Sequence, residues 1–253
     1  MKQQNQSLPD GTLTEGIKSE NQNILFEHQG KLIQKGDRPD IAVQKFYSNG
    51  ADKNLQTANT GELDELRNRI SSYLFEYLDG FHIPTHFIAK VSATEMMIRR
   101  TEPVAITLKV HNLINGSLTK RLGIKETANI DLPIIEHYFR NGQRNGTWLN
   151  EHHIYALGIA TPDEFKHINR IAAKANAILK SLCERRQLIL ADAQFEFGRA
   201  KTQIFLADEL SPITCHFLDG SIEGKSKRDR FQLDQNDANI VISQLADRIM
   251  LKA

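Results

Sequence analysis

Residues 190–198 of the chain read LADAQFEFG and alternate polar with apolar side chains. In a β-strand, residues two apart lie on the same face, so Asp192, Gln194 and Glu196 are expected to share one face. Carboxylates placed close together repel each other unless a cation joins them, and Mg²⁺ favours one or two carboxylates plus phosphate oxygens. The pattern therefore indicates a site for a divalent cation that carries nucleotide phosphates. The alternative is a solvated acidic face that binds no metal.

A hairpin is expected to bring more carboxylates to this face. Residues 202–210, TQIFLADEL, form a second strand-like stretch that delivers Asp208 and Glu209. If the turn between the strands centres on Arg199-Ala200, Asp208 lies roughly opposite Asp192. Three or four acidic groups would then meet on one face of the hairpin.

Residues 111–124, HNLINGSLTKRLGI, have the composition of an anion site. The small residues Gly116 and Ser117 precede two cations, Lys120 and Arg121, and arginine can grip phosphate or carboxylate with two parallel hydrogen bonds. A histidine, His111, stands at the head of the stretch. The alternative is an ordinary turn followed by solvated helix charges.

The periodicity of the chain predicts strands in its first part and longer helices in its second. Strands are expected within 23–47 and at 86–91, 95–100, 104–111, 187–198 and 202–210, with Pro103 in the turn before residue 104; helices are expected at 62–80, 131–142, 161–185 and 237–252. Thr161, Pro162 and Glu164 have the spacing of a capping box at a helix start. The segregation favours an α+β fold with a smaller sheet lobe, a larger mixed lobe and a ligand cleft between them.

Composition sets the broad class. The 253 residues are 25% charged and 40% hydrophobic, with a formal net charge of +1, so no global field favours nucleic acid or a membrane. Cys183 and Cys215 have neither metal-site nor disulfide spacing, which favours a reducing compartment. Residues 1–24 form a polar extension without the apolar core of a signal peptide. We expect a cytoplasmic protein that acts on small molecules.

Four stretches, GSLTKRLGI, LADAQFEFG, LADELSP and KRDRF, occur in the order and approximate spacing of the SAICAR synthetase family. This resemblance implies a two-lobe α+β fold with a nucleotide cleft, divided into the extension 1–24, a sheet lobe at 25–102 and a mixed lobe at 103–253. It also implies an ATP-dependent carboxylate–amine ligase that joins carboxyaminoimidazole ribotide to aspartate through an acyl phosphate. ATP and Mg²⁺ are the implied cofactors, and a homo-oligomer is compatible with the sequence.

The resemblance also implies roles for individual residues. These are the catalytic residues Asp192, Glu196 and Lys120; the substrate-binding residues His111, Asn112, Gly116, Ser117, Arg121, Gln194 and His216; the nucleotide-binding residues Gly30, Lys31, Arg100, Glu196 and Asp208; and the metal ligands Glu196 and Asp208. The choice between Glu196, Asp208 and Asp192 for the metal stays open, because the hairpin register above places Asp208 closer to Asp192.

Several motif positions depart from the family pattern. His111 and His216 stand where the family has arginine, Gln194 where it has lysine, and Ala105 where it has glutamate. Histidine is only partly charged at neutral pH and cannot give an anion two parallel hydrogen bonds as arginine does. The sequence therefore predicts an anion site with altered binding. The protein could carry out the family reaction with an altered pocket, or be a paralogue that amidates a different acid or uses a different amine. A third hypothesis, of another class, is a catalytically silent relative that binds nucleotide or another ligand; the retained carboxylates count against it.

Overall fold

A computed structural model describes residues 23–28, 30–47, 60–114, 116–124, 129–140, 146–222, 229, 231 and 238–251. The predicted polar extension lies outside this part except for its last two residues. The predicted loop at 48–61 lies outside it up to residue 59, and so does the side chain of Ser117.

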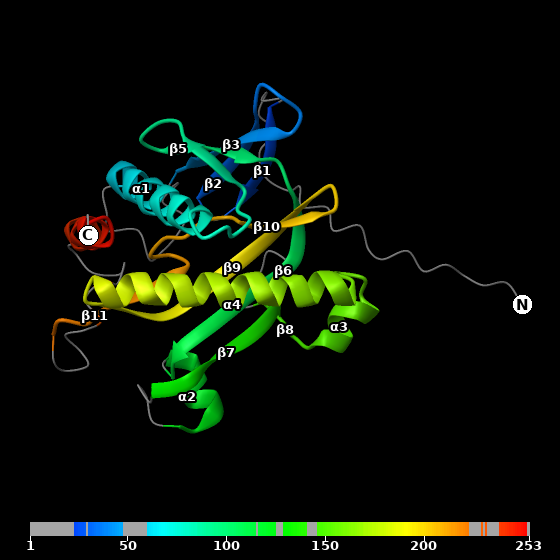
Figure 1. The fold of residues 1–253 in the computed structure, drawn as a ribbon. Coiled ribbons are helices and arrows are strands. Elements are labelled where there is room, and N and C mark those ends of the chain that lie inside the picture. The colour runs from blue at the N-terminus through cyan, green and yellow to red at the C-terminus, as the bar shows by residue number, and fades with distance from the viewer. Residues whose placement is uncertain are drawn as a thin grey trace, which may run out of the picture.

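The first sheet is antiparallel and its strands run in the order β1-β2-β3-β5-β4. Its strands are β1 (Ile24–His28), β2 (Lys31–Lys35), β3 (Ile41–Phe46), β4 (Phe87–Lys90) and β5 (Glu95–Arg99). Helix α1 (Thr60–Asp79) packs against this sheet, as Figure 1 shows. The helix forms where the apolar stripe predicted it, and Leu63, Ile70 and Leu78 on that stripe are fully buried.

The second sheet is larger and follows the order β10-β9-β6-β7-β8, with β11 also paired to β9. Its strands are β6 (Glu102–Leu113), β7 (Asn129–Phe139), β8 (Trp148–Leu149), β9 (Leu188–Ala200), β10 (Gln203–Ala207) and β11 (Cys215–Asp219). Two short helices belong to this part of the chain, α2 (Gly116–Leu122) and α3 (Glu151–Ala156), and helix α6 (Ala238–Ile249) comes last. All pairings are antiparallel.

Helix α4 (Pro162–Arg185) lies across one face of the second sheet (Figure 1). The capping box is confirmed, because Thr161 accepts a hydrogen bond from the Glu164 backbone while the Glu164 carboxylate accepts one from the Thr161 backbone. Every second residue of β6 and β9, including Leu108, Val110 and Phe195, is buried in the core that α4 joins. The opposite face of the sheet therefore presents the polar residues of these strands.

One predicted helix is wrong. Residues 131–142 were expected to be helical, but β7 runs from Asn129 to Phe139 and pairs with β6 along most of its length. The proline at position 133 has no N–H to give to a sheet, which makes a central strand unfavourable in sequence. It is tolerated because β8 pairs only with His137 and Tyr138, so β7 is an edge strand at Pro133.

Pro103 was also misplaced, since it lies inside β6 and not in a turn. It sits where the β6–β9 register shifts, between Pro103 and Thr107, and such irregular pairing is where a strand accommodates proline.

The two parts of the chain meet along β10. The segment before β4 forms a parallel bridge between Thr85 and Leu206, with hydrogen bonds from the Leu206 N–H to the Pro84 carbonyl (2.8 Å) and from the His86 N–H to the Leu206 carbonyl (2.9 Å). Helix α6 from the end of the chain packs beside α1 (Figure 1). The division into lobes at residues 102 and 103 stays a prediction.

Within the described ranges, no helix combines the length and apolar character needed to cross a membrane.

Thr161→Ala should destabilise the protein by about 1 kcal/mol, because the first turn of α4 loses an accepted hydrogen bond at its N-cap. Urea unfolding followed by circular dichroism measures this loss. Thr161→Ser keeps the hydroxyl and is the matched control, so an equal loss in both variants would contradict the capping role.

Candidate active site

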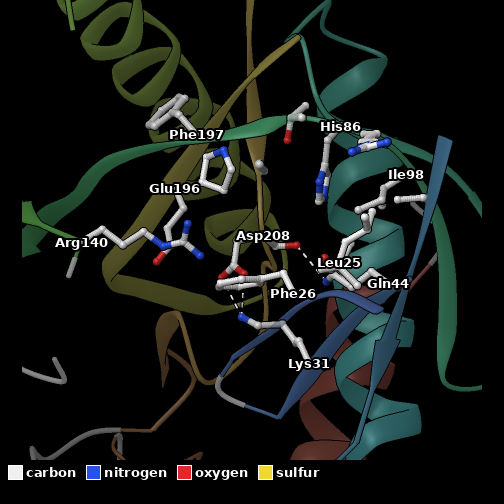
Figure 2. A pocket seen from close by; sticks show the side chains of 16 residues that line it. Leu25, Phe26, Lys31, Gln44, His86, Ile98, Arg140, Glu196, Phe197 and Asp208 are labelled. Atoms are coloured by element: carbon white, nitrogen blue, oxygen red, sulfur yellow. Dashed lines mark hydrogen bonds and ion pairs between the residues drawn. The ribbon is translucent and has the colours of Figure 1, made fainter. Parts of the chain in front are cut away.

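A cavity of about 270 Å³ lies between the two sheets (Figure 2). Its lining combines apolar side chains, among them Leu25, Ile33, Ala42, Ile98 and Phe197, with the charged residues Lys31, Arg100, Arg140, Glu196 and Asp208. Apolar walls with a few converging charges are typical of cofactor sites. Such a cavity suits a ligand with a flat apolar part and an anionic part.

Lys31 on β2 is a buried cation at the cavity wall. Its Nζ lies 2.7 Å from Asp208 Oδ1 and 3.0 Å from Glu209 Oε1. Burial favours the neutral amine, but these two carboxylates outweigh it and raise the pKa of Lys31, so the ammonium persists. Gly30 precedes it with a φ of +68°, and a Cβ there would approach the Tyr47 carbonyl oxygen to 2.7 Å. Glycine is therefore needed at position 30 to admit this approach.

The fully buried carboxylate of Glu209 is the centre of a network of ion pairs. Arg67 of α1 approaches it with Nη2 at 2.9 Å and Nε at 3.2 Å, and the Ser211 hydroxyl donates to it at 2.9 Å. Burial would raise the pKa of Glu209, but Arg67 and Lys31 more than offset this and lower it. The carboxylate is thus ionised without contact with water, and it ties α1 and β2 to the segment after β10.

Asp208 has an unusual backbone, with a φ of +71°. Aspartate is one of the few residues that enter this left-handed region at moderate cost. The Gln44 side-chain amide donates to the Asp208 carbonyl at 3.1 Å, and Lys31 holds the carboxylate, as the dashed lines in Figure 2 show. Residues of the first sheet therefore hold both the backbone carbonyl and the side-chain carboxylate of Asp208.

The hairpin register differs from the predicted one. Ala200 pairs with Gln203, so the turn lies at Lys201-Thr202 and Ala207 pairs with Glu196. Asp208 thus follows the residue that faces Glu196, and the expectation that it lies opposite Asp192 is wrong. Strand β9 continues through the predicted turn to Ala200, so the turn lies two residues later and every pairing along the hairpin changes.

Glu196 faces the cavity and is only 5% exposed. Burial and the neighbouring Asp208 charge raise its pKa. The Thr107 hydroxyl donates to Oε1 at 3.4 Å, and Arg140 Nε lies 2.7 Å from Oε2. No N–H is directed at Oε2, so within the described residues this buried oxygen forms an ion pair but accepts no hydrogen bond.

The donor set at the cavity fits Mg²⁺. Glu196 Oε2 is a buried anionic oxygen without a hydrogen bond, and Asp208 is a second carboxylate on the same wall. Across the part of the chain that the structure describes, no three His, Cys, Asp or Glu side chains are grouped to enclose a metal. Mg²⁺ does not need such a cage, because it binds through one or two carboxylates together with phosphate oxygens.

Four other predicted residues, His111, Asp192, Gln194 and His216, lie on the polar face of the second sheet. Three rows cross the strands there: Tyr138, Thr107 and Glu196; then Glu136, Lys109 and Gln194; then Ile134, His111, Asp192 and His216. The alternation of Asp192, Gln194 and Glu196 is confirmed. The face is largely buried and not the solvated strand face considered as the alternative, since Asp192 is 8% exposed.

Asp192 is held between two cations. Lys109 Nζ lies 3.2 Å from its Oδ1 and His216 Nδ1 lies 3.4 Å from its Oδ2. Burial opposes ionisation, yet these partners lower the pKa of Asp192 to about 2. His216 also lies 2.7 Å from Asp229 through Nε2, and its two carboxylate partners outweigh burial and raise its pKa. The histidine is thus more readily charged than an ordinary one.

His111 is buried and faces Glu136, with Nε2 2.9 Å from Oε2. Since the carboxylate accepts, Nε2 carries the proton, and Nδ1 is a buried lone pair without a hydrogen-bond partner within the described residues. Burial lowers the pKa of His111. Arg121 grips the same carboxylate with two hydrogen bonds of 2.7 Å, and Tyr138 donates a third at 2.7 Å. Two nitrogens of the Arg121 guanidinium group are therefore already hydrogen-bonded to Glu136.

Asn112 belongs to the contact between β6 and α4. It exchanges two amide hydrogen bonds with Asn176, at 2.9 and 2.8 Å, and both residues are buried. This pair satisfies both buried amides, so the structure places Asn112 in the core contact behind the polar face. Its predicted substrate role stays a prediction.

The anion loop begins helix α2. Gly116 is its first residue, with a φ of +51°, and the Lys120 and Arg121 side chains lie on the exposed side. Arg121 reaches back to Glu136 on β7, which connects the helix to the polar face. Lys120 makes no contact that would bring it to the cavity, and its catalytic role remains a prediction.

Four residues that shape the site were not among the predicted ones: Arg67, Gln44, Glu136 and Arg140. Arg67 lies within a helix whose apolar stripe was the visible signal. Glu136 and Arg140 belong to the stretch predicted as a helix, and a strand there would have placed Glu136 and Tyr138 on one face. Gln44 is a polar residue in an apolar strand, which is a recognisable signal for a buried hydrogen bond.

Comparison with known proteins agrees with this geometry. The sequence profile of SAICAR synthetase matches residues 53–246. A phosphoribosylaminoimidazole-succinocarboxamide synthase of Persephonella marina is 35% identical over 235 residues, which cover 92% of this chain and 98% of the relative. The one from Chlorobaculum tepidum is 34% identical over 90% of this chain and 97% of its own.

The chain belongs to the SAICAR synthetase family. Solved structures extend this result to the fold: the enzyme of Ehrlichia chaffeensis has a TM-score of 0.81 at 28% identity, over 91% of this chain and 99% of its own. A SAICAR synthetase solved in complex with ADP has a TM-score of 0.80 at 30% identity, over 89% and 97% of the two chains. The two-lobe α+β fold and membership in a family of ATP-dependent ligases are thereby confirmed.

Glu136 should make stability depend on pH in acid. Its partners Arg121, Tyr138 and His111 outweigh burial and lower its pKa from 4.5 to about 2. A depressed carboxyl pKa stabilises the fold above about pH 4.5 and loses this effect as pH falls towards 2. Glu136→Gln should therefore unfold more easily than the native chain by on the order of 3 kcal/mol at neutral pH, with a gap that narrows in acid.

Urea unfolding at a series of pH values measures this gap. Glu65→Gln, at an exposed position on α1, is the matched control and should track the native chain throughout. A gap for Glu136→Gln that stays constant from neutral pH to pH 3 would contradict the ion pairs.

Proposed function

We propose that this chain catalyses the SAICAR synthetase reaction, in which carboxyaminoimidazole ribotide, aspartate and ATP give SAICAR, ADP and phosphate. The observation that carries the proposal is the grouping of Glu196, Asp208 and Lys31 on the wall of one interlobe cavity. Carboxylates for a metal and a lysine for phosphates are the groups that phosphoryl transfer from a nucleotide requires. The relatives named above support the choice of substrates.

The cavity accommodates the nucleotide in this proposal. The apolar wall of Leu25, Ala42, Ile98 and Phe197 would take the base, and Lys31 and Arg100 on the cavity wall would face the phosphates, with Gly30 before Lys31. Glu196 and Asp208 would hold Mg²⁺, which would neutralise charge on the transferred phosphoryl group. Lys31 stays charged beside them and holds an anionic group in place.

Two chemical steps follow. An oxygen of the acid's carboxylate attacks the γ-phosphorus of ATP, the bond from that phosphorus to the β–γ bridging oxygen breaks, and ADP leaves. The amine nitrogen then attacks the acyl carbon, the bond from carbon to the phosphate oxygen breaks, and the nitrogen loses a proton as inorganic phosphate departs. Holding the amine beside the activated acyl group supplies much of the rate.

The polar face is assigned to the acid and the amine. Asp192 lies about 13 Å from Glu196 along β9, as four strand residues span that length. Its pKa of about 2 keeps it ionised, which suits an electrostatic contact with an amino group better than proton transfer at neutral pH. His111 and His216 neighbour it on the adjacent strands, Gln194 lies two residues along β9, and Arg121 reaches the same face through Glu136. Gly116 and Lys120 on α2 would complete the proposed acid site.

A second candidate function within the same class is amidation of a different acid or use of a different amine. It is favoured by the state of the two histidines, because His111 is buried against Glu136 and His216 is paired with Asp192 and Asp229. Neither presents the fork that grips a phosphate. Phosphate release with ATP and carboxyaminoimidazole ribotide plus aspartate tests the first function; turnover only with another acid or amine would establish the second.

Both ligase functions require nucleotide binding, and turnover then separates them from a silent relative that binds nucleotide. Isothermal titration with Mg-ATP should give a saturable signal, and no binding would exclude both. Cytoplasmic location, Mg²⁺ as the metal and homo-oligomerisation are part of the proposal, and the absence of nucleic-acid and membrane partners remains an expectation from the charge balance.

Glu196→Gln should lower kcat by on the order of a hundredfold or more, because it removes the anionic oxygen that faces the metal and transferred phosphate. A phosphate-release assay measures this loss. Glu102→Gln, an exposed glutamate on neighbouring β6, is the matched control and should retain activity. Full activity of Glu196→Gln would disprove the proposed metal role.

His216→Arg should raise the affinity for the ribotide by about tenfold, because arginine adds a charged fork where the histidine stands. Competition by the ribotide at fixed ATP measures the change. His137→Arg, on β7 beside Asn169 and away from His216, is the comparison and should leave affinity unchanged. If His216→Arg binds the ribotide no more tightly than the native chain, the histidine does not stand in place of a phosphate-binding arginine.

A further inference from the structure

Arg140 occupies a distinctive position in the cavity. It follows the last residue of β7, and its side chain enters the cavity towards Glu196, as Figure 2 shows. Its guanidinium carbon lies 5.5 Å from the centre of the Phe26 ring, and its Nε lies 2.7 Å from Glu196 Oε2. The arginine thus joins β7 of the second sheet to β1 of the first across the nucleotide cavity.

The arginine neutralises the group that is proposed to bind the metal. Burial and the charge of Asp208 raise the pKa of Glu196, whereas the positive charges of Arg140 and Lys31 lower it. A divalent cation at Glu196 Oε2 would stand next to a fixed positive charge at less than 3 Å from the same oxygen. Arginine and metal cannot both neutralise this oxygen at that distance without strong repulsion.

The contact between Arg140 and Glu196 has the geometry of an exchangeable pair. No N–H points at Oε2, so the pair lacks the directed hydrogen bonds that make arginine–carboxylate forks strong. The pair formed by Arg121 on α2 and Glu136 on β7 provides the contrast, with two hydrogen bonds of 2.7 Å. The flat guanidinium of Arg140 also lies over the Phe26 ring, and a long flexible side chain allows this head group to turn towards another acceptor.

We propose that Arg140 is a resident counter-ion of the metal site, which keeps divalent cations out until nucleotide phosphates draw its guanidinium away from Glu196. The proposal rests on the proposed function, because it takes Glu196 as a metal ligand. Phosphates entering the cavity offer the arginine a better acceptor than a poorly aligned carboxylate. Metal and nucleotide then bind cooperatively, and each strengthens the other by the same factor.

Binding of Mn²⁺ alone tests this directly, with free Mn²⁺ measured by electron paramagnetic resonance. Arg140→Met keeps the stem and removes the charge, so it should bind Mn²⁺ on the order of tenfold more tightly than the native chain. Arg140→Lys restores a cation and should return the affinity towards the native value. Arg185→Met removes an exposed arginine from α4 and controls for net charge.

Three further measurements sharpen the outcome. The gain in Mn²⁺ affinity should vanish in the double variant Glu196→Gln with Arg140→Met. Added ADP should strengthen Mn²⁺ binding more in the native chain than in Arg140→Met. Circular dichroism confirms that each variant is folded, and Arg140→Gln replaces Arg140→Met if the latter is not. The proposal is overturned if the charge-free variant binds Mn²⁺ no more tightly than the native chain, or if the gain survives loss of Glu196.

This result is distinguishable from failure of the proposed function. The comparison of Mn²⁺ alone uses no nucleotide and no substrate, so it can succeed in a protein that catalyses nothing. Absence of ATP binding or turnover would instead refute the ligase functions while leaving the competition between Arg140 and the metal measurable.

Discussion

The carboxylate of Glu209 is buried without access to water, and the geometry of the cavity depends on how its charge is balanced. An ion taken out of water is stabilised only by close opposite charges and hydrogen bonds, and here Arg67 comes from α1, Lys31 from β2 and a hydroxyl from Ser211. Loss of one partner would leave an uncompensated buried charge, which costs about 3–5 kcal/mol. The network therefore fixes the segment after β10 against the first sheet, and with it the left-handed backbone of Asp208.

The second sheet separates two environments along a single strand. On β9, Glu196 faces the interlobe cavity, and Asp192, four residues earlier on the same strand, is enclosed by Lys109 and His216. Strand alternation places both on one face, while the apolar residues between them hold the sheet against α4. A reaction that couples a nucleotide to a second molecule needs such a separation, with one bound group at each end and the reacting atoms between.

Local patterns were readable from the sequence and long-range pairings were not. The alternation in β9 and the capping box of α4 are properties of a few neighbouring residues, and both appear as predicted. The strand β7 was mistaken for a helix because an edge strand can contain Pro133, and being at an edge is a property of the whole sheet.

The same limit applies to the site. Arg67 and Glu209 lie 142 residues apart, and only the folded arrangement shows that they meet. The carboxylates were identifiable from their spacing, but their order along the hairpin depended on a turn displaced by two residues. The altered motif positions were visible as well, whereas the internal carboxylates that pair with His111 and His216 became apparent only when the strands were assembled.

The backbone bridge between residues 84–86 and Leu206 has a consequence for how the cavity exchanges its contents. These hydrogen bonds join the lobes at one side of the first sheet, next to β4, while β1 lies at the opposite edge of that sheet. Separation at the bridge would break backbone hydrogen bonds, and the ion pairs of Lys31 with Asp208 and Glu209 hold β2 across the cavity. Rearrangement of side chains that line the cavity, such as Leu25 and Phe26 on β1, therefore costs less than separation of the two sheets.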